Sequence, residues 1–267
     1  MKTVHQLMNL KSRVALVTGG AGHIGRALCS ALADQGARVV VLDVDGGACR
    51  KTAAALRKSH KIAALPLEVD LADQRQVTAV APAVLRKFGR IDILVNNAAM
   101  VGALAVKGWA VPLARQRADT WRQALEVNLT AAFLLTQACA GALGRAGHGS
   151  VINIGSIYGL VGPDLSLYEG TTMGNPAAYA ASKGGLLAMT RWFATVLAPK
   201  VRVNAITPGG VLRNQPAPFR RHYTARVPLR RMATEEDLKG AVAFLASDLS
   251  AYVTGHNLIV DGGWTAW

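Results

Sequence analysis

Short apolar runs alternate along the whole chain with segments of helical length, and this alternation limits the possible folds more than any other feature. The runs span Arg13–Thr18, Arg38–Asp43, Ile62–Glu68, Ile91–Val95, Ser150–Ile154, Val201–Ile206 and Asn257–Val260. They are mostly continuous, which is typical of strands covered on both faces. Helices are predicted between them, among others at Gly25–Gln35, Asp73–Phe88, Trp121–Leu143 and Ala177–Leu197.

Alternating strands and helices imply crossover connections between parallel strands, and such connections are almost always right-handed. No internal repeat, low-complexity block or linker interrupts the alternation over the 267 residues, a length that one large domain can have. The sequence therefore predicts an α/β fold. We expect a doubly wound sheet of about seven parallel strands flanked by helices, in one domain that spans residues 1–267.

Composition excludes several classes of protein. Hydrophobic residues make up 51% of the chain and the mean hydropathy is +0.24, so intrinsic disorder is not expected. No apolar run reaches the roughly 18 uncharged residues of a membrane span, and the polar stretch 1–10 does not resemble a signal peptide. Three cysteines without a Cys-x-x-Cys pair and six scattered histidines predict neither disulfides nor a catalytic metal. We expect a soluble cytoplasmic protein without a membrane partner.

The net charge of +14 and the pI of about 10.3 are compatible with a nucleic-acid binder. However, aromatic residues are not interleaved with the basic clusters, and no nucleic-acid-binding motif is present. We therefore expect no nucleic-acid partner and interpret the charge as an arginine-rich surface on an ordinary globular protein.

A glycine-rich turn, Thr-Gly-Gly-Ala-Gly-His-Ile-Gly at residues 18–25, follows the first predicted strand and opens a helix. Glycine permits positive φ and close backbone approach, and a helix N-terminus offers free N–H groups to a pyrophosphate. A tight turn without a ligand would also use glycine, but the place between strand and helix favours a dinucleotide site. The residues expected to contact this cofactor are Gly19, Gly22, His23, Ile24 and Gly25.

Asp43 ends the second predicted strand, eighteen residues after Gly25. A carboxylate at this place accepts hydrogen bonds from the adenosine ribose hydroxyls and repels a 2′-phosphate. The next residue is Val44 and not a basic one. The sequence therefore predicts NAD(H) as the cofactor in preference to NADP(H).

Tyr179 and Lys183 are four residues apart on a predicted helix, so both side chains lie on the same face. A phenol normally titrates near pH 10 and is a poor base at neutral pH. A neighbouring ammonium favours the phenolate, so we expect Lys183 to lower the pKa of Tyr179 enough for acid–base catalysis. Such a pair also occurs on ordinary surfaces, and the pair alone does not identify a site.

Together with these residues, further motifs resemble the short-chain dehydrogenase/reductase superfamily in its compact, single-domain branch. They occur in the family's order from about Leu10 to the C-terminus: Thr18–Gly25, Asp70-Leu71, Asn96-Asn97-Ala98-Ala99, Val127-Asn128-Leu129, Ser156, Tyr179–Lys183, Pro208-Gly209 and Val260-Asp261-Gly262-Gly263. Each motif is weak alone, but the ordered set is specific. The resemblance implies a Rossmann-like domain that exchanges a hydride between NAD(H) and a small molecule.

The resemblance also implies a role for each matching residue. Tyr179 would be the general acid/base, Lys183 would bind the nicotinamide ribose, and Ser156 would hold the substrate oxygen. Asn128, at a helix kink, would support a proton relay behind Lys183. The expected cofactor contacts also include Asp70, Leu71, Asn96, Ala98, Pro208, Gly209 and Val211. Taken alone, Ser156 is equally compatible with a strand end and Asn128 with a satisfied polar group in a helix.

The chain departs from the family pattern in three ways. His23 stands where the compact branch has its middle glycine, and the glycine lies at position 22, a spacing typical of the larger sugar-nucleotide epimerase branch. Arg213 occupies a position where relatives usually carry threonine. The loops 100–119 and 157–178 are longer than usual and follow strand ends, where doubly wound sheets bind ligands, so we expect them to shape the substrate pocket.

Residues 212–232, named the lid segment below, match the family's mobile lid over the substrate. They contain no acidic residue and six arginines, which are Arg213, Arg220, Arg221, Arg226, Arg230 and Arg231. Guanidinium binds carboxylate and phosphate in bidentate fashion, so this charge favours a polar or anionic sugar-type substrate. The alternative is a solvated basic loop that faces away from the site.

The helical stretches 129–143 and 186–197 are apolar nearly all round and need cover on more than one side. They predict a homo-oligomer, a dimer or tetramer, as the family resemblance also implies. Three functions compete with an NAD(H)-dependent alcohol or ketone oxidoreductase: a sugar-nucleotide epimerase or dehydratase, a 3-oxoacyl-carrier-protein reductase, and a dinucleotide sensor without turnover. A sensor would not need Ser156, Tyr179, Lys183 and Asn128 together.

Overall fold

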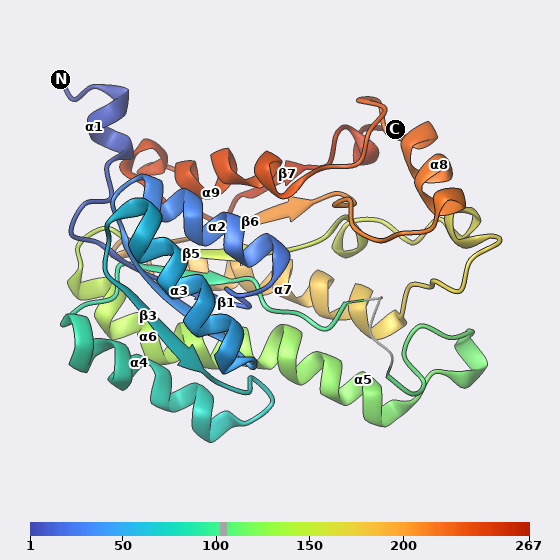
Figure 1. Ribbon diagram of the computed structural model, residues 1–267, viewed down its shortest axis with the longest axis horizontal. Helices are drawn as coiled ribbons and strands as arrows, with labels where there is room; N and C mark the ends of the chain where they lie inside the picture. Colours follow the sequence, from blue (N-terminus) through green and yellow to red (C-terminus); the bar gives the residue numbers. More distant parts are fainter. Residues whose placement is uncertain (102–105) are drawn as a thin grey trace.

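Each predicted apolar run forms one strand of a single sheet (Figure 1). The computed structural model describes residues 1–101 and 106–267. In their order across the sheet, the strands are β3 (Ala64–Glu68), β2 (Arg38–Asp43), β1 (Val14–Thr18), β4 (Ile93–Asn96), β5 (Gly149–Ile154), β6 (Val201–Pro208) and β7 (Asn257–Val260). Every pairing between neighbours is parallel, so the predicted seven-stranded fold is confirmed.

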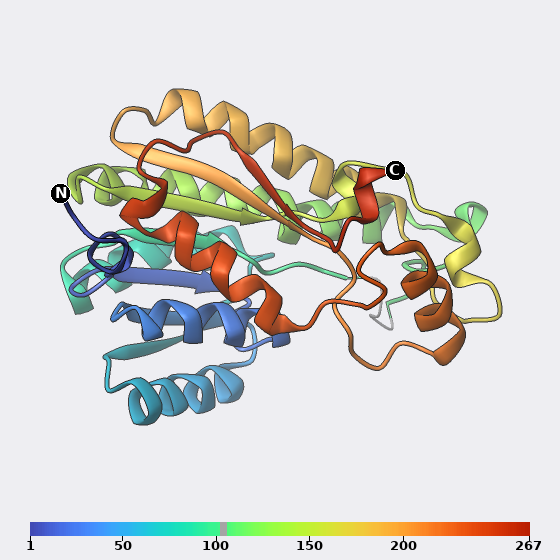
Figure 2. The ribbon, with the colours of Figure 1, turned by 90° about the horizontal axis from the view of Figure 1, so that it is seen from above.

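Helices cover both faces of this sheet. They are α1 (Val4–Met8), α2 (His23–Asp34), α3 (Gly46–His60), α4 (Gln74–Phe88), α5 (Ala118–Leu125), α6 (Ala131–Arg145), α7 (Ala177–Val196), α8 (Ala217–Arg226) and α9 (Lys239–Ala246). The helices α2, α3 and α9 pack on one face, and α4, α6 and α7 pack on the other (Figures 1 and 2). The pattern is doubly wound, as predicted.

The two helical layers explain why the strands are apolar at successive residues. In β1, Ala15 and Val17 pack against the α2 side, whereas Val14 and Leu16 pack against the α4 side. Side chains of a strand alternate between faces, and both faces are buried here. All five residues of β1 are buried.

The predicted helix Trp121–Leu143 belongs to a longer helical segment, residues 118–145, which a π turn at Glu126–Thr130 divides into α5 and α6. Its length and composition alone would allow it to cross a membrane, so the prediction that no apolar run is long enough is wrong. The stretch 127–144 has no charged side chain, because its polar residues are uncharged amides and hydroxyls. In the structure, α6 buries Leu135, Cys139 and Leu143 against the sheet.

The strand order reverses between β1 and β4. The chain runs outward from β1 to β2 and β3, and then returns to β4 on the other side of β1. At such a point the loops that follow neighbouring strands diverge and leave a crevice at the carboxyl edge of the sheet. Figure 2 shows α8 and the loop that follows β5 side by side beyond this edge. The predicted site residues therefore converge there.

Candidate active site

Close backbone contacts hold the turn at residues 18–25 in shape. Gly19 has a φ of +60°, and its carbonyl accepts a hydrogen bond from the N–H of Gly22 at 3.1 Å. A Cβ on Gly25 would lie 2.0 Å from the Gly19 carbonyl oxygen, so only glycine fits at this position. Because of this contact, α2 begins at His23 directly against the turn.

The amino end of α2 has no side-chain cap. Gly22 is its N-cap residue and offers nothing to the first N–H groups, whereas Asp45 and Asp73 accept hydrogen bonds at the starts of α3 and α4. Free N–H groups at a helix N-terminus are frequent partners of phosphate. The turn therefore fits the pyrophosphate of the dinucleotide expected from the sequence.

Asp43 lies beside this turn at the end of β2, as predicted. One of its oxygens accepts from the N–H of Ala21 at 3.2 Å and the other from the N–H of Val44 at 2.9 Å. An ionised carboxylate has about four acceptor sites, so it can also take ribose hydroxyls. The His23 ring is exposed at the start of α2, with its Nδ1 3.7 Å from the Glu235 carboxylate.

Thr18 and Asn97 join the turn to the end of β4, although the sequence reasoning gave neither a separate role. The Thr18 hydroxyl accepts from the N–H groups of Asn97 and Ala98 at 2.9 and 3.0 Å. The Asn97 amide donates to the carbonyls of Thr18 and Gly19 at 2.8 and 3.1 Å. Both residues belong to recognised motifs, but only the pairing of β1 with β4 shows why they are needed.

The remaining predicted cofactor residues follow the carboxyl ends of three other strands. Asp70 and Leu71 follow β3, Asn96 and Ala98 lie at the end of β4, and Pro208, Gly209 and Val211 lie at the end of β6. Asn96 is the last residue of β4, where it was expected, and its amide donates to the Asn153 side chain at 2.8 Å in the interior. Its side chain thus links β4 to β5.

Ser156, Tyr179 and Lys183 come together from two elements, as predicted. Ser156 follows β5, and the other two lie in the first turns of α7. The Ser156 hydroxyl accepts from the N–H of Tyr158 at 3.3 Å and lies close enough to Tyr179 to lower the pKa of its phenol. Lys183 is 2% exposed, donates from Nζ to the Ile154 carbonyl at 2.7 Å, and has its Nζ 5.7 Å from the centre of the Tyr179 ring. An ammonium has three donors, and the described contacts use one of them.

Asn128 lies in the π turn between α5 and α6, which is the helix kink that the resemblance implied. Its side-chain oxygen accepts from the N–H of Met100 at 2.7 Å, and its amide donates to the Ser182 hydroxyl at 3.0 Å. Ser182 in turn donates to the Tyr179 carbonyl at 2.8 Å. Asn128 therefore connects the loop after β4 to the turn of α7 that carries Tyr179.

The electrostatics of Tyr179 differ from the expectation. Burial raises its pKa above the ordinary value, while the nearby Ser156 hydroxyl and the positive charge of Arg213 lower it in part. Burial also lowers the pKa of Lys183, to about 8. Arg213 thus contributes a positive charge that lowers the Tyr179 pKa, while the Lys183 ammonium donates to the Ile154 carbonyl.

The lid segment begins and ends at one short parallel bridge. Val211 pairs with Ala233, the N–H of Leu212 donates to the Ala233 carbonyl at 2.8 Å, and the N–H of Ala233 donates to the Gly210 carbonyl at 2.9 Å. The segment forms α8 between these ends, and the hydroxyl of Tyr223 in α8 accepts from the N–H of Gly210. Both ends of the segment thus lie beside the end of β6.

Two of the six lid arginines form ion pairs with acidic residues outside the lid segment. Arg226 lies 2.6 Å from Asp164, and Arg231 lies 2.7 Å from Asp237. Tertiary contacts thus bring acidic residues to two of the six arginines, although the lid segment itself contains none. Within the described residues, no ion pair is formed by Arg213, Arg220, Arg221 or Arg230. Of these, Arg213 is the one whose charge reaches Tyr179.

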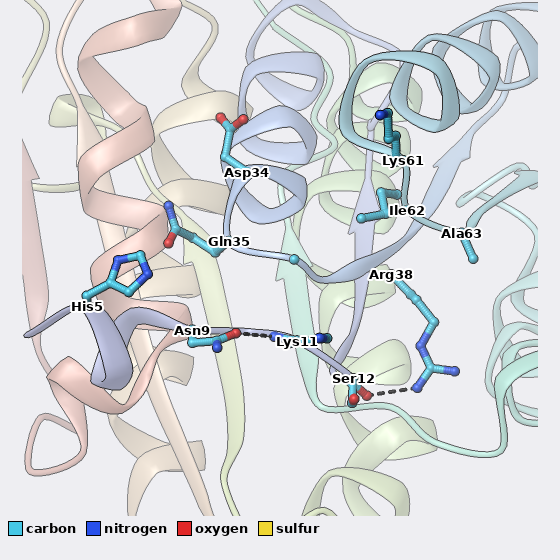
Figure 3. A pocket seen from close by; sticks show the side chains of 11 residues that line it. His5, Asn9, Lys11, Ser12, Asp34, Gln35, Arg38, Lys61, Ile62 and Ala63 are labelled. Carbon is cyan, nitrogen blue, oxygen red and sulfur yellow. Dashed lines mark hydrogen bonds between the residues drawn. The ribbon is translucent and has the colours of Figure 1, made fainter. Parts of the chain in front are cut away.

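A cavity of about 650 Å³ lies at the opposite end of the sheet, beside the amino ends of β1, β2 and β3, and Figure 3 shows the side chains that line it. Lys11, Arg38 and Lys61 contribute cations to its lining, with Asp34 as the acidic residue. None of the predicted site residues lines it. Part of the positive charge of the chain is therefore far from the cofactor edge. Among the described residues, no cluster of three or more His, Cys, Asp or Glu could hold a metal ion.

Comparison with known proteins gives consistent matches over nearly the whole chain. The model of the enoyl-(acyl carrier protein) reductase family matches residues 19–265. Cis-4-hydroxycyclohexanecarboxylate dehydrogenase of Sinomonas cyclohexanicum is 36% identical over 259 residues, which cover 95% of this chain and 97% of that protein. A short-chain type dehydrogenase/reductase of Mycobacterium marinum has a TM-score of 0.87 and 28% identity, with 100% of both chains covered.

A further solved structure bears on the cofactor. It is a candidate NAD(P)-dependent gluconate 5-dehydrogenase of Beutenbergia cavernae, with NADP bound at low occupancy. Its TM-score is 0.85 and its identity 35%, with 98% of this chain and 100% of that chain covered. The sheet order, the order of the motifs and these matches agree with one another. The chain belongs to the short-chain dehydrogenase/reductase superfamily.

Proposed function

We propose that the protein is an NAD(H)-dependent oxidoreductase that converts a secondary alcohol to its ketone, or the reverse, in a small substrate with an anionic group. The anionic group is inferred from the position of Arg213. Its guanidinium lies close enough to Tyr179 to lower the pKa of the phenol, and it has no acidic partner within the described residues. An unpaired guanidinium beside the reacting groups favours a carboxylate or phosphate. The related enzyme from Sinomonas cyclohexanicum acts on a hydroxy acid of this kind.

The site residues divide the chemistry among them. A bound nicotinamide supplies or accepts the hydride at the carbon that bears the oxygen. Ser156 holds that oxygen by a hydrogen bond, and Tyr179 takes the proton from the hydroxyl during oxidation and returns it during reduction. The free N–H donors of Lys183 would bind the nicotinamide ribose. Asn128 positions the α7 turn through Ser182.

The preference for NAD(H) rests on Asp43. Its carboxylate lies at the end of β2 with acceptor sites to spare, and the neighbouring Val44 is 65% exposed and uncharged. The residue that follows Asp43 therefore brings no positive charge to balance a 2′-phosphate. The relative from Beutenbergia cavernae was solved with NADP bound at low occupancy.

A second candidate, the reduction of 3-oxoacyl groups on a carrier protein, is favoured by the description of the matching family. Asp43 disfavours it, because such reductases mostly use the phosphorylated cofactor. A sugar-nucleotide epimerase is favoured only by the glycine spacing around His23, and it would produce no net NADH. A sensor is disfavoured, because Ser156, Tyr179 and Lys183 meet in one place.

The first prediction concerns the proton carrier. Tyr179→Phe should lower the turnover rate by about 10² to 10⁴ and leave NAD(H) binding nearly unchanged. Because the pKa of Tyr179 is raised above its ordinary value near 10, oxidation by the wild type should speed up with rising pH through this range as the phenolate fraction grows. Reduction, which needs the protonated phenol, should stay nearly constant until the pH passes that raised pKa. Initial rates and calorimetric binding measure both effects. A variant within a few-fold of the wild type would show that another group carries the proton.

The second prediction concerns the cofactor. The wild type should bind NADH on the order of a hundredfold more tightly than NADPH, because Asp43 repels the 2′-phosphate. Asp43→Ala should narrow this ratio, and Asp45→Ala, which removes a nearby carboxylate at the start of α3, serves as the control. Isothermal titration gives both dissociation constants. Equal or tighter binding of NADPH by the wild type contradicts the assignment.

The third prediction concerns Arg213. With 4-hydroxycyclohexanecarboxylate and cyclohexanol as matched probes, Arg213→Gln should lower kcat/KM for the acid roughly tenfold to a hundredfold more than for the neutral alcohol. It should also shift the pH profile of cyclohexanol oxidation upward, since Arg213 lowers the Tyr179 pKa. Arg86→Gln on α4 is the control, because it removes the same charge from another part of the chain and should leave the ratio between the two probes unchanged. An unchanged ratio in Arg213→Gln would overturn the anionic substrate.

We also propose a homo-oligomer in a reducing compartment such as the cytoplasm. The oligomer is supported by Trp192 and Val196 on α7, which are each 54% exposed although their helix is largely apolar. The reducing compartment is supported by the cysteines, which are buried free thiols at Cys29, Cys49 and Cys139. Light scattering at micromolar protein should give a mass of two or four times 28.1 kDa. Trp192→Glu should lower that mass by placing a charge in the contact. A wild type of 28.1 kDa would contradict the proposal.

A further inference from the structure

Two tyrosine hydroxyls of the 157–178 loop meet beside the candidate site. Tyr158 lies two residues after Ser156, and its hydroxyl is 2.7 Å from that of Tyr168. Burial raises the pKa of both phenols, and each is close enough to Tyr179 for a charge there to raise it further. Both phenols therefore stay protonated in the physiological pH range.

The pair has a donor left over. When two hydroxyls share one hydrogen bond, one proton lies between them and the other is free to donate elsewhere. The described hydrogen bonds give neither the Tyr158 nor the Tyr168 hydroxyl a second partner. Both tyrosines are partly buried, so the free donor is held in a fixed place and is suited to a ligand that brings an acceptor.

The surrounding contacts hold the pair in place. The Tyr168 ring lies 5.5 Å from the ring of Phe219 in α8, and Leu167 next to it is fully buried. The ion pair between Asp164 and Arg226 joins the same loop to the end of α8. Figure 2 shows this loop and α8 side by side. The two hydroxyls thus lie where the loop, the lid segment and Ser156 meet.

We propose that the Tyr158–Tyr168 pair is a second recognition point for the substrate, which donates a hydrogen bond to its carboxylate while Ser156 and Tyr179 hold the reacting oxygen. This inference rests on the proposed function and adds residues to the same site. A carboxylate has two oxygens that only accept, so one can face the guanidinium of Arg213 and the other the phenol pair. Arg213 then attracts the carboxylate by its charge, and the hydrogen bond from the tyrosine pair fixes where the carboxylate lies. The site would therefore distinguish hydroxy acids by the position of the acid group relative to the hydroxyl.

The test removes single hydroxyls from the holoprotein. Tyr158→Phe and Tyr168→Phe should each lower kcat/KM for 4-hydroxycyclohexanecarboxylate by roughly tenfold or more, as expected for a lost hydrogen bond to a charged group. The value for cyclohexanol should stay within about twofold, because that probe has no acceptor for the pair. Tyr252→Phe, an exposed tyrosine remote in sequence, is the matched control. Affinity for NADH, measured by calorimetry, reports whether each variant keeps its fold.

The outcomes separate this inference from the proposed function. If the wild type prefers the acid and Arg213→Gln removes the preference, but both tyrosine variants keep it, the pair is not a recognition point. Equal losses with both probes would assign the pair a structural role only, which also overturns the inference. If the wild type does not distinguish the two probes, the proposed function fails and the inference fails with it.

Discussion

The contact between Gly25 and the carbonyl of Gly19 is the constraint on which the site depends. Because no Cβ fits there, α2 starts against the end of β1, and its uncapped N–H groups lie where the strand order reverses. Thr18 and Asn97 fasten the same turn to β4. One backbone contact thus determines where a dinucleotide phosphate can lie, and the parallel strands place the other site residues relative to it.

The buried ammonium of Lys183 shows how the site balances charge. An ammonium that leaves water is destabilised unless polar groups surround it, and here its bond goes to a neutral carbonyl, Ile154. Its pKa consequently falls to about 8. Acceptors from a bound ribose would favour the charged form, so binding of the cofactor and protonation of this lysine are coupled. Arg213, on an exposed segment, provides positive charge without that desolvation.

Much of the fold and of the site could be predicted because both depend on local pattern. Continuous apolar runs indicate strands with two covered faces, and the ordered motifs follow strand ends, so Ser156, Tyr179 and Lys183 were predictable as one group. Contacts between distant residues were not predictable. Asp164 forms an ion pair with Arg226, and Asn96 bonds to the Asn153 side chain, in each case across a long stretch of sequence. The kink at Asn128 could be expected from the family resemblance alone, because the composition of its helix gives no sign of a break.

Val211 and Ala233 hold both ends of the lid segment at one backbone bridge. The part of the chain between them therefore forms a closed loop whose base stays the same whatever its length, and the entropy of closing such a loop changes only slowly with added residues. Insertions and substitutions there need not disturb β6 or the start of α9. The lid segment can thus change, and with it the range of substrates, while the cofactor site stays the same. Val211 and Ala233 are therefore suitable boundaries for replacing this lid segment with that of a relative.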